Sequence, residues 1–305
     1  MDRRKFIIGS VCCMSMFMAS ACSHRHGSVY DLFEGSEKLG HIEIHLCEHC
    51  NLNCKYCSHF SCIAEEEFYN VEKYEQDIMQ LAKVTEAKIS NIQLLGGEPL
   101  LHPDINKIFD ITRKYFPESN IDLVTNGLRL RKQNEDFWLT MNKNNIYLCP
   151  SFYPVNINWK AVLNKAKKYG VNVTTDGREE KITLKNIENH RITQFYKLNL
   201  DLQGTQKWEK GACPFGPSCC NFIDGKLYPC FVISNIRHFN KKFNKKLPVT
   251  KNDYINIYET DSIKQINDFM NNKLPVPFCR YCAPYTKGFK WENADKHSIK
   301  EWVKL

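Results

Sequence analysis

The sequence lacks internal repeats, low-complexity tracts and any apolar run long enough to cross a membrane. The absence of repeats excludes a solenoid, and the absence of biased tracts argues against long disordered segments. The main apolar run, Phe6–Ala21, is shorter than the about 20 residues that a spanning helix needs. With 305 residues, 43% hydrophobic and 25% charged, the chain is typical of a soluble globular protein with one large domain and a small one.

Cysteine, in contrast, is abundant, with fifteen residues in the chain. In a secreted protein such a number would indicate disulfides. Here the cysteines gather in short motifs within a long chain, which favours metal or cluster ligands in a reducing compartment. We therefore expect a cytoplasmic location.

The N-terminal segment, residues 1–28, conflicts with that location. Arg3, Arg4 and Lys5 precede the apolar run, and small residues precede Cys22, as in a signal-like leader with a twin-arginine address or a lipoprotein cleavage box. Three interpretations stay open: the leader tethers a cytoplasmic enzyme to the membrane, the start codon is placed too early, or the chain is an exported lipoprotein.

The most specific motif is a run of three cysteines, Cys50, Cys54 and Cys57, with the spacing Cys-x3-Cys-x2-Cys. It follows a strand-like stretch, His41–Leu46. Iron–sulfur clusters are usually held by four thiolates, so three on one loop leave one iron of a four-iron cluster open to a ligand. A zinc site is the alternative, but zinc usually binds two Cys-x2-Cys pairs or Cys/His pairs, which this loop lacks.

Strand-like and helix-like patterns alternate from residue 41 to about 203. The pattern predicts strands at 42–46, 92–95, 121–124, 146–149, 171–175 and 197–202, and it predicts helices over 71–84, from Pro103 to Pro117, over 134–144 and around 159–166. Strands alternating with helices indicate parallel βαβ units. Because a closed eight-unit barrel needs about 250 residues, we predict an α/β fold with a partial (β/α)6 barrel.

Two further motifs follow predicted strands. Gly96-Gly97-Glu98-Pro99 follows the second strand, where paired glycines allow close backbone approach to a ligand and Glu98 offers a carboxylate to an ammonium group. Thr125-Asn126-Gly127 follows the third strand. Either motif alone is equally typical of a plain turn. Their order after the cysteine loop is the specific feature, since the carboxyl ends of parallel strands share one edge of a sheet.

In this combination the chain resembles the radical S-adenosylmethionine (SAM) enzymes, over residues 41–203 for the core and to about 282 with the extension. The resemblance implies that Cys50, Cys54 and Cys57 bind a [4Fe–4S] cluster whose fourth iron is chelated by SAM. It implies that SAM is cleaved to a 5′-deoxyadenosyl radical that takes a hydrogen atom from the substrate. It further implies SAM contacts from Tyr56, Gly96, Gly97, Glu98, Thr125, Asn126 and Ser151.

A second group of cysteines lies in residues 204–305. From spacing alone it forms one four-cysteine site, and a zinc knuckle is an alternative. The upstream core makes it resemble a Twitch-type SPASM extension, a small cysteine-rich α+β domain with one auxiliary [4Fe–4S] cluster. Family precedent implies Cys213, Cys230, Cys279 and Cys282 as its ligands, with Cys219 as a competitor and Cys220 leaving the register ambiguous. We expect the segment from Asp224 to Cys230 to form a hairpin.

The remaining cysteines, the histidines near the loop and three polar residues are interpreted from their positions alone. Cys47, Cys62 and Cys149 are predicted as small buried residues. His45, His49 and His59 flank the cysteine loop and are expected to pack there or to tune the cluster. Tyr153, Asp176 and Arg178 are candidate substrate contacts near the mouth of the barrel.

The resemblance implies an enzyme that oxidises a small or carbohydrate-type substrate, with an external electron donor such as flavodoxin or ferredoxin and no nucleic-acid partner. The auxiliary cluster would accept the second electron. Maturation of a ribosomal peptide is the alternative within the same chemistry. A non-catalytic iron–sulfur electron-transfer or zinc-binding protein is the alternative of another class, and it would bind metal without affinity for SAM.

Overall fold

The computed structural model describes residues 38–174, 192–193, 197–201, 220–272, 275–283 and 289–304. The leader, residues 1–28, lies outside the described residues. None of the described helices combines the length and the apolar character that crossing a bilayer requires.

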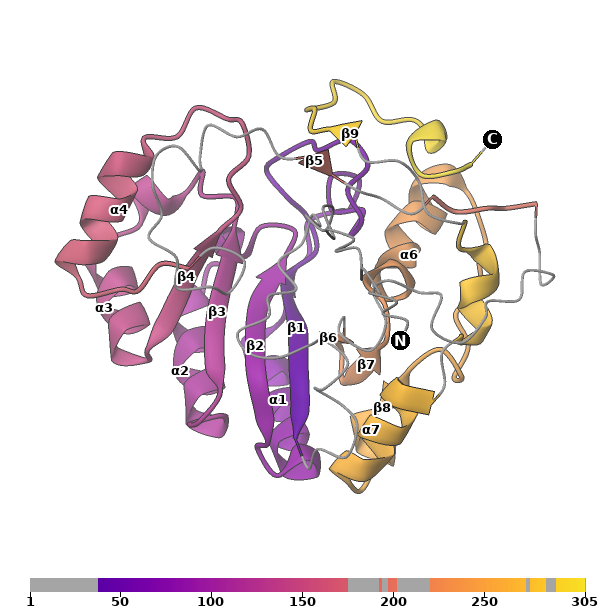
Figure 1. Ribbon diagram of the computed structural model, residues 1–305, viewed down its shortest axis with the longest axis horizontal. Helices are drawn as coiled ribbons and strands as arrows, with labels where there is room; N and C mark the ends of the chain where they lie inside the picture. The colour runs from indigo at the N-terminus through magenta and orange to yellow at the C-terminus, as the bar shows by residue number, and fades with distance from the viewer. Residues whose placement is uncertain are drawn as a thin grey trace, which may run out of the picture.

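An open, mainly parallel sheet forms the centre of the molecule (Figure 1). Its strand order is β4-β3-β2-β1-β6-β7-β8, and the strands from β4 to β6 are parallel. The bounds of the first four strands are β1 Leu39–Cys47, β2 Ile89–Gly96, β3 Asn120–Thr125 and β4 Ile146–Pro150. The predicted α/β class is confirmed, and the sheet does not close into a barrel.

Four helices alternate with these strands, and α1, α2 and α3 lie behind the sheet in Figure 1. Their bounds are α1 Val71–Thr85, α2 Ile105–Tyr115, α3 Glu135–Lys143 and α4 Trp159–Lys168. Asparagine side chains accept a backbone N–H at the start of α1, α3 and α4, which satisfies donors that a helix leaves unpaired. Pro103 was expected at the start of α2, but the helix begins two residues later, at Ile105.

The fifth and sixth predicted strands differ from expectation. Residues 171–174 contribute a single parallel bridge, between Val173 and Leu148 at the β4 edge. Leu198, in the predicted sixth strand, bridges Cys282 and Val303 of the C-terminal part. Within the described residues, the sheet position beside β1 is taken by β6, Cys220–Ile223, which runs parallel to β1.

The chain after β6 turns back as the predicted hairpin. Strand β7, Lys226–Tyr228, pairs antiparallel with β6 through the two-residue turn Asp224-Gly225, both of whose residues have positive φ. This is the turn geometry that matches the twist of paired strands. The remaining elements are α6 Phe231–Phe243, β8 Ile255–Asn256, α7 Ile263–Asn272, and the small pair β5 Ile192–Thr193 with β9 Phe289–Lys290.

The two faces of the sheet have opposite chemistry. On one face the register aligns Ile44 with Leu94, Leu123 and Leu148, all fully buried and part of the core that includes the α1 residues Ile78 and Leu81. On the other face the register aligns a polar row whose members are Asn221, Glu43, Gln93, Asp122 and Tyr147. These strands were expected to be apolar, and the polar row was not predicted, although charged residues alternate with isoleucines along β1.

Candidate functional site

The three-cysteine loop begins directly after β1, at the carboxyl edge of the parallel strands. Two of its sulfurs receive N–H donors. Cys50 Sγ accepts from the backbone of Leu52 at 3.4 Å and from Asn126 Nδ2 at 3.6 Å. Cys54 Sγ accepts from the indole of Trp291 at 3.1 Å. N–H donors aimed at sulfur suit thiolate ligands, so this loop fits an iron–sulfur cluster.

The thiols differ in acidity. Burial raises the pKa of the Cys50 thiol, and it raises the pKa of Cys54 to about 12. A hydrogen bond from Cys62 lowers the pKa of Cys57 to about 5. Loading a cluster would therefore release protons from Cys50 and Cys54, because metals bind the deprotonated thiol.

Cys62 is a fourth thiol at this loop. It was predicted as a buried packing residue, but it is half-buried and its thiol pairs with Cys57. Among the described residues, no three Cys, His, Asp or Glu side chains converge on a point that one metal ion could occupy. A four-iron cluster does not need such a point, since each thiolate binds a different iron.

The paired glycines lie against the cysteine loop itself. A Cβ on Gly96 would lie 2.3 Å from the Cys47 carbonyl oxygen, and one on Gly97 would lie 2.0 Å from that of His49. Gly97 N–H donates to Cys47 O at 2.6 Å, and Glu98 N–H donates to His49 O at 3.1 Å. The glycines were expected to let the backbone approach a ligand closely. In the structure they let the end of β2 approach the backbone that leads into Cys50.

Glu98 links the second and third motifs. Its carboxylate is fully buried and accepts from Thr125 Oγ1 at 2.7 Å, from the Asn126 backbone at 2.9 Å and from the Leu100 backbone at 3.0 Å. Burial raises the pKa of Glu98 to about 7, against these hydrogen bonds, which lower it. Asn126 Nδ2 then donates to Asn51 Oδ1 at 2.7 Å. The three motifs therefore form one connected network.

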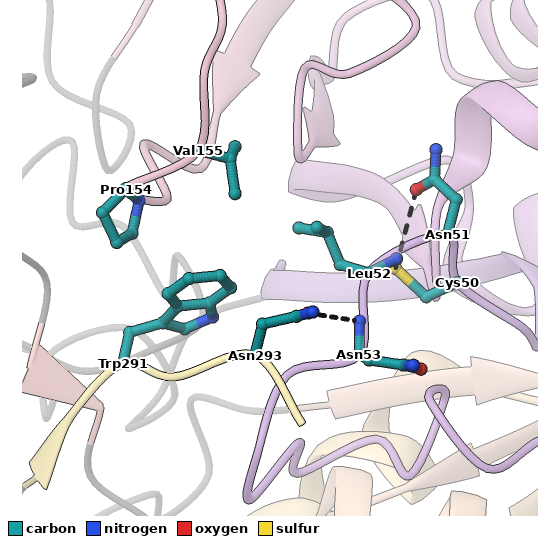
Figure 2. A pocket seen from close by; sticks show the side chains of 8 residues that line it. All are labelled: Cys50, Asn51, Leu52, Asn53, Pro154, Val155, Trp291 and Asn293. Carbon is teal, nitrogen blue, oxygen red and sulfur yellow. Dashed lines mark hydrogen bonds between the residues drawn. The ribbon is translucent and has the colours of Figure 1, made fainter. Parts of the chain in front are cut away.

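A cleft of about 440 Å³ opens beside this network (Figure 2). The cysteine loop forms one wall, and the segment after β4 and a C-terminal segment form the others. Its lining residues are Cys50, Asn51, Leu52, Asn53, Pro154, Val155, Trp291 and Asn293. Clefts of 300–1,000 Å³ that combine apolar walls with a few polar groups are typical of small-molecule sites.

None of the predicted SAM contacts is among the described residues that line this cleft. The Ser151 backbone N–H donates to Thr125 O at 2.8 Å, which holds the chain after β4 beside the third motif. Tyr56 has a left-handed backbone, with φ of 61°, and its ring lies 5.6 Å from Lys197 Nζ. Tyr153, a candidate substrate contact, places its ring 5.5 Å from that of Trp291 at the cleft. Asp176 and Arg178 lie outside the described residues.

The histidines near the loop differ in surroundings. His45 is buried, and neither ring nitrogen has a hydrogen-bond partner among the described residues. Its ring lies edge-on against His59 at 4.9 Å. Burial lowers the pKa of His45 to about 3. His49 packs against Phe68 at 5.1 Å, and its Nδ1 lies 3.2 Å from Cys47 Sγ. The main contacts of His45 and His49 are thus packing contacts with neighbouring rings.

The second cysteine group is only partly visible. Cys230 lies at the N-terminus of α6, and Cys279 and Cys282 lie on and just after the short helical turn Pro277–Tyr281. All three are half-buried. Cys213 and Cys219 lie outside the described residues, so the auxiliary cluster stays a prediction. The neighbouring Cys220 is fully buried in β6.

Known proteins resemble this chain in its first half. Residues 44–149 match the Radical SAM superfamily. A GTP 3',8-cyclase of Nautilia profundicola is 31% identical over 102 residues, covering 33% of this chain and 31% of that protein. A GTP 3',8-cyclase of Clostridium botulinum strain Hall is 28% identical over 99 residues, covering 32% and 31%. The matched part is thus about a third of these relatives' length.

Solved structures resemble the chain more distantly. BtrN in complex with AdoMet and 2-DOIA aligns with a TM-score of 0.46 at 18% identity, covering 76% of this chain and 82% of that chain. The enzyme anSMEcpe with bound AdoMet and the Cp18Cys peptide aligns with a TM-score of 0.36 at 18% identity, covering 45% and 42%. The match to the Radical SAM superfamily, over residues 44–149, covers the part of the chain that contains all three motifs.

Proposed function

We propose that the chain is a radical SAM enzyme that cleaves SAM reductively and removes a hydrogen atom from its substrate. The observation that carries the proposal is the hydrogen-bonded path from Glu98 through Asn126 to Asn51 and Cys50. An electron carrier needs the cysteine loop alone, whereas an enzyme of this family must also shape a SAM site beside it. The match of residues 44–149 to the Radical SAM superfamily also supports an enzyme.

The chain's own residues would divide the work. Cys50, Cys54 and Cys57 would hold a [4Fe–4S] cluster, which with SAM supplies the radical chemistry. Glu98 fixes the Thr125 hydroxyl and the Asn126 backbone. Asn126 Nδ2 in turn donates to Asn51, which lines the cleft where SAM would lie. The cleft walls would keep water and competing C–H bonds away from the reacting atoms.

We favour a small polar substrate. The cleft of about 440 Å³ has asparagine amides on its walls. Polar groups on the walls of a small-molecule site favour ligands that can hydrogen-bond, such as hydroxyl-rich compounds. Oxidation of a small or carbohydrate-type substrate therefore remains our preferred reaction, ahead of peptide maturation.

A second cluster held by Cys230, Cys279 and Cys282 belongs to the same proposal. Cys213 would be its fourth ligand, with Cys219 as the alternative. The two-electron character of the reaction depends on this cluster, which would take up the second electron after hydrogen removal. External electron transfer would come from a flavodoxin- or ferredoxin-type donor.

The test is anaerobic reconstitution of the full chain with iron and sulfide, followed by reduction in the presence of SAM. We expect 5′-deoxyadenosine and methionine in equal amounts, and we expect none from a Cys54→Ala variant. Equilibrium binding of SAM separates the non-catalytic alternative, which predicts a bound cluster without SAM affinity. Absence of 5′-deoxyadenosine with a loaded cluster, with candidate substrates added, would contradict the proposal.

A further inference from the structure

The C-terminal segment Lys290–Ala294 lies along the cysteine loop, more than two hundred residues away in sequence. Lys55 N–H donates to Glu292 O at 2.9 Å, and Ala294 N–H donates to Asn53 O at 2.7 Å. Cys54 and Asn293 form an antiparallel bridge, and Asn53 N–H donates to Asn293 Oδ1 at 3.0 Å (Figure 2). These contacts fix the backbone of the segment without help from the Trp291 side chain.

That backbone carries the indole of Trp291, which both lines the cleft and contacts Cys54. Its Nε1–H donates to Cys54 Sγ at 3.1 Å, well within the range for a hydrogen bond to sulfur. The ring also lines the cleft and lies 5.5 Å from the ring of Tyr153. An indole N–H facing a cleft could point to solvent, but here it points to one particular sulfur of the loop.

We propose that Trp291 is a positioning residue that sets the reduction potential of the SAM-binding cluster through its hydrogen bond to Cys54. The inference rests on the proposed function. Hydrogen bonds to the sulfurs are among the protein's means of tuning such clusters. A donor at a thiolate stabilises the more negative, reduced cluster, so this bond raises the potential and makes the cluster easier to reduce.

The experiment is an electron paramagnetic resonance titration of the reconstituted full chain against a series of reducing potentials, without SAM. The cluster at the loop is identified afterwards as the one whose signal changes when SAM is added. We expect Trp291→Phe to keep its iron and its fold by circular dichroism and to shift the midpoint of this cluster to a lower potential. Trp291→Leu, which also lacks an N–H, should shift it in the same direction.

Asn293→Ala is the matched control, because it removes a contact to the loop backbone and leaves the indole in place. Its midpoint should stay at the wild-type value. An unchanged midpoint in Trp291→Phe, or an equal shift in Asn293→Ala, would overturn the inference. So would a folded Trp291→Phe chain that binds no iron, since the indole would then hold the loop together instead of tuning it.

The experiment distinguishes failure of the proposed function from failure of the role of Trp291. A cluster whose signal ignores SAM contradicts the enzyme proposal, yet the loop cluster can then be identified by its loss in Cys54→Ala, and the Trp291 comparison still applies to it. A SAM-responsive cluster with an unchanged midpoint leaves the enzyme standing and overturns the role of Trp291 alone.

Discussion

Glu98 is the residue on which the arrangement of the site depends most. The sequence suggested direct contact between its carboxylate and an ammonium group. In the structure the carboxylate is buried and accepts from Thr125, Asn126 and Leu100. Its chemistry is that of an acceptor hub between two loops, and any contact with SAM would be added to these bonds.

Replacing Glu98 by glutamine tests the hub. A glutamine amide puts an NH₂ donor where one carboxylate oxygen accepted, so at least one buried N–H or O–H loses its partner. We expect the free energy of unfolding of the metal-free chain to fall by about 1–3 kcal/mol in urea denaturation. Glu75→Gln is the control, because Glu75 lies partly exposed on α1 and pairs with Lys114 at the surface. Equal stabilities of the two variants would refute the hub.

The same variant has a pH signature. Burial raises the pKa of Glu98 in the folded chain to about 7, above its ordinary value of 4.5. The folded state therefore holds this proton more tightly than the unfolded state does. Stability from this group is present below pH 4.5 and is lost as the pH rises through about 7. Because glutamine does not titrate, wild type should lose stability relative to Glu98→Gln as the pH rises from 4.5 to about 7. Urea denaturation of both chains across this range measures the difference.

Single residues could be predicted where a local motif carries them. Cys50, Cys54 and Cys57 and the strand-end glycines follow from spacing within a few residues. Trp291 and Cys62 could not be predicted, because their roles come from contacts that no local pattern records. Trp291 reaches Cys54 across 237 positions of sequence, and Cys62 pairs with Cys57 through the path of the loop.

At the level of elements, β2 and the cysteine loop are held together by backbone contact. Gly97 packs its Cα against the chain at His49, where a side chain would have only backbone atoms to displace. The loop that follows β1 is therefore shaped by the end of β2. Helix α6 holds the same segment from the other side, since His238 Nε2 lies 2.6 Å from Glu48 Oε2 and Arg237 lies 3.1 Å from it.

Gly97→Ala tests this contact between elements. The added methyl would lie 2.0 Å from His49 O, so the loop must move. We expect a loss of about 1–3 kcal/mol in unfolding free energy, together with lower iron content after reconstitution. Gly170→Ala is the control, because it strains a left-handed position after α4, away from the loop, and should cost stability without lowering iron content. Full iron loading of a folded Gly97→Ala chain would contradict this account.

The elements that could be predicted are those with a clear period. Strands β1 to β4 and helices α1 to α4 match the predicted order within a few residues, because buried parallel strands and amphipathic helices leave regular patterns. The pairing partners of residues 171–174 and 197–201 could not be predicted. Their pairing is decided by distant partners, Leu148 in one case and Cys282 with Val303 in the other. The polar row was missed because strands of a parallel sheet, buried on both faces, were expected to be apolar throughout.

For the molecule as a whole, the second half of the chain completes the first. Strand β6 extends the parallel sheet beside β1, and the indole of Trp302, near the C-terminus, donates to Cys57 O at 2.9 Å. Residues 41–203 as a core and 204–305 as an auxiliary-cluster domain remain our proposal for the division of the chain. Contacts of this kind, between residues far apart in the chain, could not be predicted from the sequence.

The central claim is that three cysteines hold a four-iron cluster with one iron left for SAM. Mössbauer and electron–nuclear double resonance spectra of the reconstituted chain, with ⁵⁷Fe and isotope-labelled SAM, test it most directly. We predict that one iron in four changes when SAM is added and couples to its amino nitrogen and carboxylate oxygen, in wild type and Cys62→Ala alike. Four sulfur-ligated irons that do not respond to SAM, with Cys62 as the fourth ligand, or a single zinc ion at the loop, would contradict the account.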